Sequence, residues 1–203
     1  MDEKKIVLYV LTDQWCEWEG SYAVDVIHSY SDEYQVKTIS EDGRPQKGMS
    51  GVTSLVDYDM REFADWNRVA LVLMPGGLGW EELELKKMEQ FVATALQKKI
   101  PVCAICGATT FLCRRGFLNN IRHTGDSKEW FLQQKAFGYT GEALYEEKQV
   151  VYDGGIMTAN ETAAVEFAYE IMNLLGVDTQ EERDEWYENF SLCRGTLVRK
   201  HGL

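Results

Sequence analysis

The hydrophobic pattern of the chain begins with short, uninterrupted apolar runs. Three of them lie at residues 6–11, 69–74 and 101–105. Continuous runs of this length are typical of strands that are buried on both faces, as in a parallel sheet. The third run starts with Pro101, and proline is tolerated at the first position of a strand. We therefore expect three buried strands here.

Other segments have apolar residues at helical spacing. The spacing predicts helices over about 20–30, 85–99 and 164–175, the last ending at Gly176. Strand and helix patterns alternate along the chain, and this alternation favours an α/β fold. The expected architecture is a doubly wound, mostly parallel sheet with helices on both faces.

Weaker patterns fill the gaps between these elements. Residues 34–39 have the composition of a second strand, and Asp153-Gly154 lies between two short apolar runs, as in a β-hairpin. Glycines and a proline between residues 43 and 51 predict an irregular excursion with a short hairpin.

The composition changes after Gly176. Residues 180–188 are rich in acid, and the apolar positions that follow suit an amphipathic helix: Trp186, Phe190, Cys193 and Leu197. We divide the chain into an α/β domain, 1–177, and a C-terminal helical extension, 178–203. The extension is expected to pack back on the domain, and a lid or a dimer contact is the alternative.

Composition and charge narrow the function classes. The chain has 203 residues, 45% of them hydrophobic, and a net charge of −12. An acidic protein repels phosphate backbones, so nucleic acid is not an expected partner. No apolar stretch is long enough to span a bilayer, and the residues before the first strand lead us to expect no secretory leader. We therefore expect a cytoplasmic protein with reduced thiols and no membrane partner.

The clearest candidate for chemistry is Cys106. It follows the buried run 102–105 and precedes Gly107, with a helix pattern after it. This strand–nucleophile–helix order is that of a nucleophile elbow, and a helix N-terminus favours the thiolate. The alternative is that a cysteine in such a place is only a small buried hydrophobic residue, and this interpretation fits Cys103 and Cys113. A C-x-x-C redox pair of Cys103 and Cys106 fits the spacing, but Cys103 would lie inside a buried strand.

Two further segments are candidates for the site: one follows a predicted strand, and the other precedes a predicted helix. Gly76 and Gly77 follow the run 69–74. The backbone N–H groups of such a turn can form an oxyanion hole, and the alternative is a tight strand-to-loop turn without a catalytic role. Glu17 and Glu19 lie among aromatic residues, where a carboxyl can have a raised pKa. The alternative is two solvated glutamates at the start of a helix.

Histidine is the usual general base, and the chain has three. His123 lies in a polar segment just before a helix that Asp126 is placed to cap. It is either a general base for Cys106 or a structural residue of the capping loop. Few and scattered histidines also argue against a metal site, and we expect none.

Taken together, these motifs resemble the DJ-1/PfpI (ThiJ) superfamily, which has the class I glutamine-amidotransferase-like fold. The resemblance covers roughly residues 4–176 and rests on Met74-Pro75-Gly76-Gly77, Ala104-Ile105-Cys106-Gly107-Ala108, Glu19 six residues before Asp25, and the segment 154–160. It implies a flavodoxin-like sheet, with helices on both faces and a nucleophile elbow.

The resemblance also assigns roles. Cys106 is similar to the family's reactive nucleophile, and Glu19 to the glutamate that hydrogen-bonds its sulfur. By this resemblance, Gly77 and Gly107 correspond to the backbone N–H donors for an oxyanion, and Gly76 belongs to the same substrate-binding turn. The segment around His123 resembles a loop that places a histidine near the cysteine. The peptidase-like branch carries histidine where this chain has Gly107, which makes peptidase activity unexpected.

The implied function is a cysteine-dependent hydrolase or glyoxalase-type enzyme that acts on a small amide or carbonyl substrate. The alternative is a redox sensor or stress-response protein in which Cys106 is oxidised. No cofactor is expected. Family members are often dimers, so a homodimer is the expected assembly.

Overall fold

The computed structural model describes residues 3–81 and 85–191. Its central sheet has the strand order β5-β2-β1-β6-β7-β9-β8, and neighbouring strands are parallel except for the β8–β9 hairpin. The strands of this sheet are β1 (Lys5–Val10), β2 (Tyr34–Ser40), β5 (Tyr58–Asp59), β6 (Val69–Met74), β7 (Val102–Ile105), β8 (Val150–Asp153) and β9 (Ile156–Ala159). A separate antiparallel hairpin joins β3 (Gln46–Lys47) and β4 (Thr53–Ser54).

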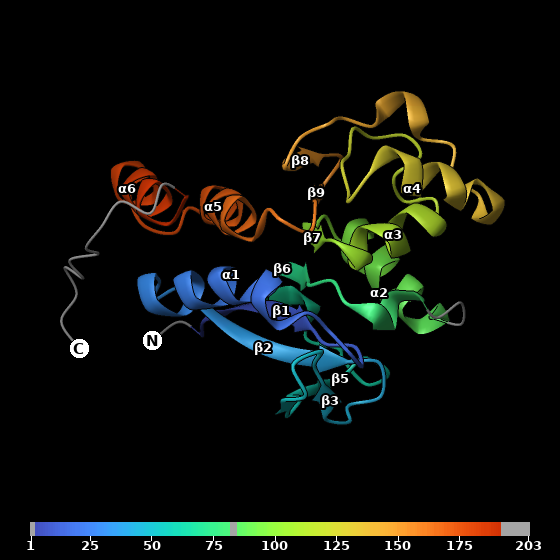
Figure 1. Cartoon of the computed structure of the whole chain (residues 1–203). Helices are drawn as coiled ribbons and strands as arrows, with labels where there is room; N and C mark the ends of the chain where they lie inside the picture. Colours follow the sequence, from blue (N-terminus) through green and yellow to red (C-terminus); the bar gives the residue numbers. More distant parts are fainter. Residues whose placement is uncertain (1–2, 82–84, 192–203) are drawn as a thin grey trace.

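Helices cover both faces of the sheet (Figure 1). One face carries α1 (Glu17–Tyr30), α5 (Ala164–Leu175) and α6 (Gln180–Ser191); the other carries α2 (Lys86–Gln97), α3 (Gly107–Arg114) and α4 (Lys128–Gln133). Short 3-10 turns are η1 (Trp66–Arg68), η2 (Leu78–Glu81), η3 (Gln134–Phe137) and η4 (Glu142–Leu144). Among the described residues, no helix has the length and hydropathy needed to cross a membrane.

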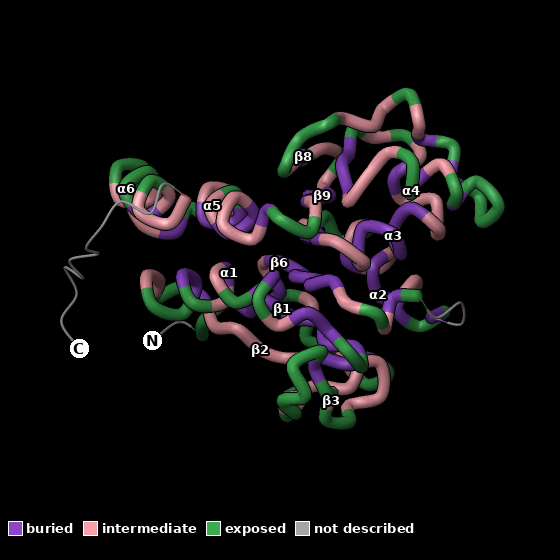
Figure 2. The backbone as a smooth tube through the Cα atoms, viewed as in Figure 1, coloured by how far each residue is buried: buried purple, intermediate pink, exposed green. Residues whose placement is uncertain are grey.

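The core consists of two apolar layers, one on each side of the sheet. Along β1, alternate side chains enter opposite layers, since Ile6 and Leu8 join the α2–α3 side while Val7 and Tyr9 join the α1–α5 side. The buried segments of the tube in Figure 2 follow these strands and the inner sides of the helices. A strand that is buried on both faces has no polar side to display, which explains the uninterrupted apolar runs.

The doubly wound, mostly parallel α/β fold is therefore confirmed. One boundary differs from the sequence pattern: α1 begins at Glu17 and contains Gly20 in its first turns. A Cβ at Gly20 would lie 2.4 Å from the Tyr9 hydroxyl, so the glycine allows α1 to approach β1 closely. It does not mark the start of the helix.

The start of the C-terminal extension lies on the α1–α5 face. Trp186 of α6 is 3% exposed. Its ring centroid lies 6.2 Å from that of Tyr22 of α1, in an edge-on contact, and 4.7 Å from that of Phe190, in a tilted one. Cys193 and Leu197, which the amphipathic pattern included, lie outside the described residues.

Candidate active site

Cys106 lies at the junction of β7 and α3 in a conformation that few non-glycine residues adopt. Its φ of 54° and ψ of −127° bring it to the N-cap of α3, and its carbonyl accepts hydrogen bonds from the N–H and Oγ1 of Thr109 at 2.8 and 2.7 Å. A Cβ at Gly107 would lie 2.6 Å from the Gly77 carbonyl oxygen. The tight turn therefore requires a residue without a side chain directly after the cysteine.

Glu19 reaches the same place from α1. Its side chain is buried, and Oε2 accepts a hydrogen bond from the Gly76 N–H at 2.7 Å. A Cβ at Gly76 would lie 2.4 Å from that oxygen and 2.9 Å from the Cys106 sulfur. The carboxyl and the thiol thus meet over the bare backbone of Gly76.

Burial dominates the electrostatics of this pair. It raises the pKa of the Glu19 carboxyl, while contacts with the Cys106 and Cys16 thiols and the Gly76 N–H act in the opposite direction. Burial also raises the pKa of Cys106; the charge of Glu19 adds to this effect, and the Gly107 N–H opposes it. Two acids in one partly dry space favour a state with a single negative charge.

Asp126 is a site residue that the sequence analysis missed. The Cys106 sulfur and one carboxylate oxygen each of Asp126 and Glu161 all lie within 4.8 Å of one another. Asp126 does not cap α4, because Ser127 does so by accepting the Trp130 N–H at 3.1 Å. Instead, Asp126 accepts the backbone N–H of Glu161 at 3.0 Å. Burial, followed by the charge of Glu161, raises the pKa of Asp126.

Loop placement explains why this cluster was missed. Glu161 follows β9, which pairs with β7 directly beside Cys106, and only the strand order reveals this neighbourhood. The thiol and the two carboxylates are also close enough to hold one metal ion. The scarcity of histidines therefore does not exclude a metal site, because the donors here are oxygen and sulfur atoms.

His123 is not brought to the thiol. It is fully buried, with Nδ1 2.8 Å from the Ile121 carbonyl and Nε2 2.8 Å from the Tyr139 hydroxyl. A carbonyl only accepts, so Nδ1 carries the proton and Nε2 accepts from the tyrosine. Phe131 stacks on the ring at 5.8 Å, and burial lowers the pKa of the imidazole. The expectation that His123 lies near Cys106 was wrong: it packs in an aromatic cluster.

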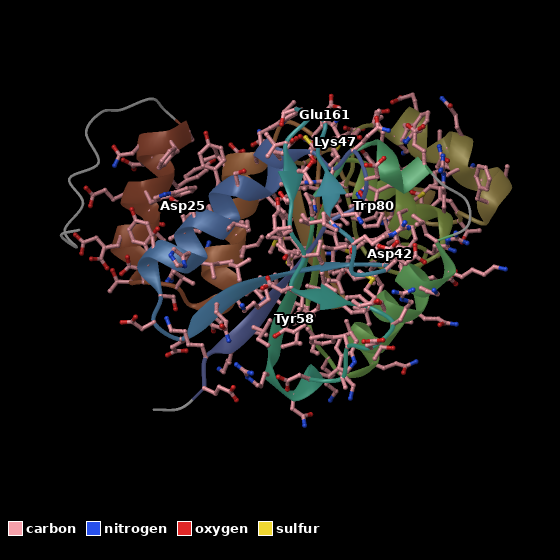
Figure 3. All side chains as sticks on the ribbon, turned by 90° about the horizontal axis from the view of Figure 1, so that it is seen from below. Asp25, Asp42, Lys47, Tyr58, Trp80 and Glu161 are labelled. Carbon is pink, nitrogen blue, oxygen red and sulfur yellow. The ribbon has the colours of Figure 1, made fainter. Side chains whose placement is uncertain are left out.

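A cavity of about 470 Å³ opens above the elbow. Glu161 and Trp80, two of the residues that line it, are labelled in Figure 3. The full lining consists of Cys16, Trp18, Glu19, Met49, Gly77, Leu78, Trp80, Glu81, Cys106, Gly107, Thr110, Asp126, Trp130, Glu161 and Thr162. Cys103 is fully buried in β7 and outside this lining, which argues against a C-x-x-C redox pair.

Comparison with known proteins identifies the family. The model of the DJ-1/PfpI family matches residues 4–174. The chain belongs to the DJ-1/PfpI family. A relative in Bacillus subtilis named "Uncharacterized protease YdeA" is 38% identical over 178 residues, which is 87% of this chain and 86% of that protein. A second B. subtilis relative, "Uncharacterized protease YoaZ", is 27% identical, with 93% and 91% covered.

Solved structures agree with this assignment. The DJ-1 superfamily protein Atu0886 from Agrobacterium tumefaciens superposes with a TM-score of 0.83 at 28% identity, covering 94% of this chain and all of that one. A thiJ/pfpI family protein from Bacillus anthracis gives 0.84 at 25% identity, with 95% and 92% covered. Family membership accounts for the elbow and the sheet, and it leaves the reaction open.

Proposed function

We propose that this DJ-1/PfpI protein is an enzyme in which the Cys106 thiolate attacks the carbonyl carbon of a small amide or other carbonyl compound. One observation carries the proposal: the half-buried Cys106 side chain lines a cavity of about 470 Å³. Cavities of this size bind small molecules. The strained backbone at Cys106 supports the same conclusion, because such strain concentrates at functional sites.

The chemistry follows from the groups around the sulfur. In amide hydrolysis, a new C–S bond forms and the carbonyl π electrons move to oxygen, where the N–H groups of Gly77 and Gly107 would stabilise the charge. The oxyanion then collapses, the C–N bond breaks, and the amine leaves with a proton from Glu19. Water then attacks the thioester and gives a proton back to Glu19, the C–S bond breaks, and the carboxylic acid leaves as the thiolate is restored. With an α-oxoaldehyde, the same attack gives a hemithioacetal.

Glu19 is the proposed proton carrier because it lies against the sulfur and burial raises its pKa. His123 is not part of this mechanism, since both of its ring nitrogens have partners inside the aromatic cluster.

The B. subtilis relatives carry the word protease in their names. We nevertheless propose that turnover of proteins is negligible here. The histidine that follows the cysteine in the peptidase-like branch is replaced by Gly107, and a side chain at that position would collide with the Gly77 carbonyl. The cavity therefore lacks the base that such peptidases use.

The test is turnover of small amides, esters and α-oxoaldehydes, with casein as the protein substrate. Cys106→Ser should abolish turnover, and Cys113→Ala, a buried cysteine outside the cavity, serves as the matched control. His123→Gln should retain activity to within a few-fold, far from the roughly 10²–10⁴-fold loss expected on removal of a general base. If the wild type turns over none of these compounds, the redox-sensor alternative replaces the proposal.

A further inference from the structure

The cavity above Cys106 carries charge of one sign. Four carboxyl groups line it, and no lysine or arginine is among the lining residues in the described part of the chain: Glu19, Glu81, Asp126 and Glu161. The whole chain has the same sign, with a net charge of −12. Negative charges that line a cleft with low-dielectric walls concentrate cations in it and exclude anions.

Tryptophans at the mouth of the cavity are a second, separate feature. Trp18 and Trp130 line it and remain 55% and 37% exposed, while Trp80 lies buried beneath. The Trp130 indole is held in place because its N–H donates to Thr110 Oγ1 at 2.9 Å. Indole faces attract cations, and exposed apolar side chains around a pocket mark a binding site.

We propose that the substrate of this site is cationic: a small amide or ester with an ammonium group close to the carbonyl that Cys106 attacks. This inference rests on the proposed function and adds the substrate class. Asp126 and Glu161 would hold the cation, and the indole rings would cover its apolar part.

The spacing of the groups supports an ammonium only a few bonds from the carbonyl. The sulfur and the two carboxylate oxygens lie within 4.8 Å of one another. Attack needs the carbonyl carbon about 3 Å from the sulfur. An ammonium–carboxylate hydrogen bond is about 2.8 Å long. An amide with an α-ammonium group satisfies both conditions together.

Repulsion between the Asp126 and Glu161 carboxylates also favours a cationic substrate. The Asp126 carboxyl is half-buried beside Glu161, whose charge helps to raise its pKa. A bound cation would relieve this repulsion, whereas a substrate carboxylate would add to it.

The first experiment probes the charge of the cavity without any turnover. Cys106 is modified with methanethiosulfonate reagents that carry a trimethylammonium, a methyl or a sulfonate group, and the rate is followed by mass spectrometry of the Cys106 peptide. EDTA is present so that no metal ion neutralises the carboxylates. The cation-to-anion rate ratio should exceed the ratio for free 2-mercaptoethanol by at least about tenfold.

Charge-matched variants locate the effect. Asp126→Asn and Glu161→Gln should each lower the ratio several-fold, and the asparagine oxygen can still accept the Glu161 N–H. Glu129→Gln changes the net charge equally at an exposed position of α4 outside the lining, and it should leave the ratio unchanged. A ratio equal to that of 2-mercaptoethanol, or one that neither variant lowers, would overturn the inference.

The second experiment compares three p-nitroanilides: that of glycine, with a free ammonium, and its neutral N-acetyl and anionic N-succinyl derivatives. The expected order of kcat/KM is cationic, neutral, anionic, with at least about tenfold between the extremes. Equal turnover of all three, together with a flat reagent ratio, overturns the inference and leaves the proposed function standing. Absence of any turnover with the reagent ratio intact overturns the function and leaves the cation-selective cavity.

Discussion

Cys106 and Glu19 illustrate how a single residue without a side chain, Gly76, makes a reactive pair possible. The carboxyl oxygen and the sulfur both lie within 3 Å of the point where a Cβ of Gly76 would stand. Burial raises the pKa of both acids, and two charges there would repel each other. We therefore expect Glu19 to keep its proton when the thiol ionises and to donate a hydrogen bond to the thiolate.

Substitutions at Glu19 test this arrangement. Glu19→Gln keeps a donor, so the pKa of Cys106 should stay within about one unit of the wild-type value, whereas the shorter Glu19→Asp should raise it by more than about one unit. The measurement is the ultraviolet absorbance of the thiolate against pH, with Cys106→Ser subtracting the other thiols. Three identical curves would show that Glu19 does not contact the sulfur.

His123 couples folding to pH. Burial lowers the pKa of its imidazole in the folded state, so below the unfolded pKa of about 6.5 the unfolded chain binds the proton more readily. Its contribution to stability is therefore full above about pH 6.5 and is lost as the pH falls from there toward the folded pKa, by at most about 1.4 kcal/mol per pH unit.

Urea unfolding at several pH values measures this loss against His123→Gln, which cannot titrate. The difference between the two free energies of unfolding should shrink as the pH is lowered through this window. Glu19 and Asp126, whose raised pKa values act in the opposite direction, are common to both proteins and cancel in the comparison. A difference that does not change with pH would contradict the burial of a neutral imidazole.

At the scale of elements, the sequence predicts what depends on local pattern. Strands β6 and β7, and β1 after the exposed Lys5, are apolar because both of their faces are buried, and α5 ends at Gly176, which adopts φ +68°. The two-residue strand β5 was not predicted, because a segment that short has no period and is defined only by its pairing with β2.

The residues of the candidate site also fall into two groups, those in local sequence motifs and those brought together only by the fold. Cys106, Glu19, Gly77 and Gly107 belong to motifs with fixed order, and all four line the cavity. The proximity of Asp126 and Glu161 arises from strand order and from one loop hydrogen bond, and no local signal encodes it. His123 looked like a polar loop residue, whereas its partners Phe131, Tyr139 and Tyr145 come from later in the chain.

For the molecule as a whole, the C-terminal extension raises the question of whether α6 stabilises the domain or acts as a lid. In Figure 1, α6 lies beside α5 on the face opposite α3 and α4. Both α4 residue Trp130 and α3 residue Thr110 line the cavity, and no residue of α6 does. The described part of the extension thus lies away from the candidate site.

Trp186→Ala separates the two roles. The side chain is 3% exposed and belongs to the α1–α5 core, so its truncation should cost about 3–5 kcal/mol of unfolding free energy, as for other buried tryptophans. Glu185→Ala, an exposed neighbour, should change it by less than about 0.5 kcal/mol. Because α6 does not border the cavity, the rate at which iodoacetamide labels Cys106 in the folded protein should be the same in both variants. Equal unfolding energies would show that the extension is not part of the core, and faster labelling in Trp186→Ala alone would identify it as a lid.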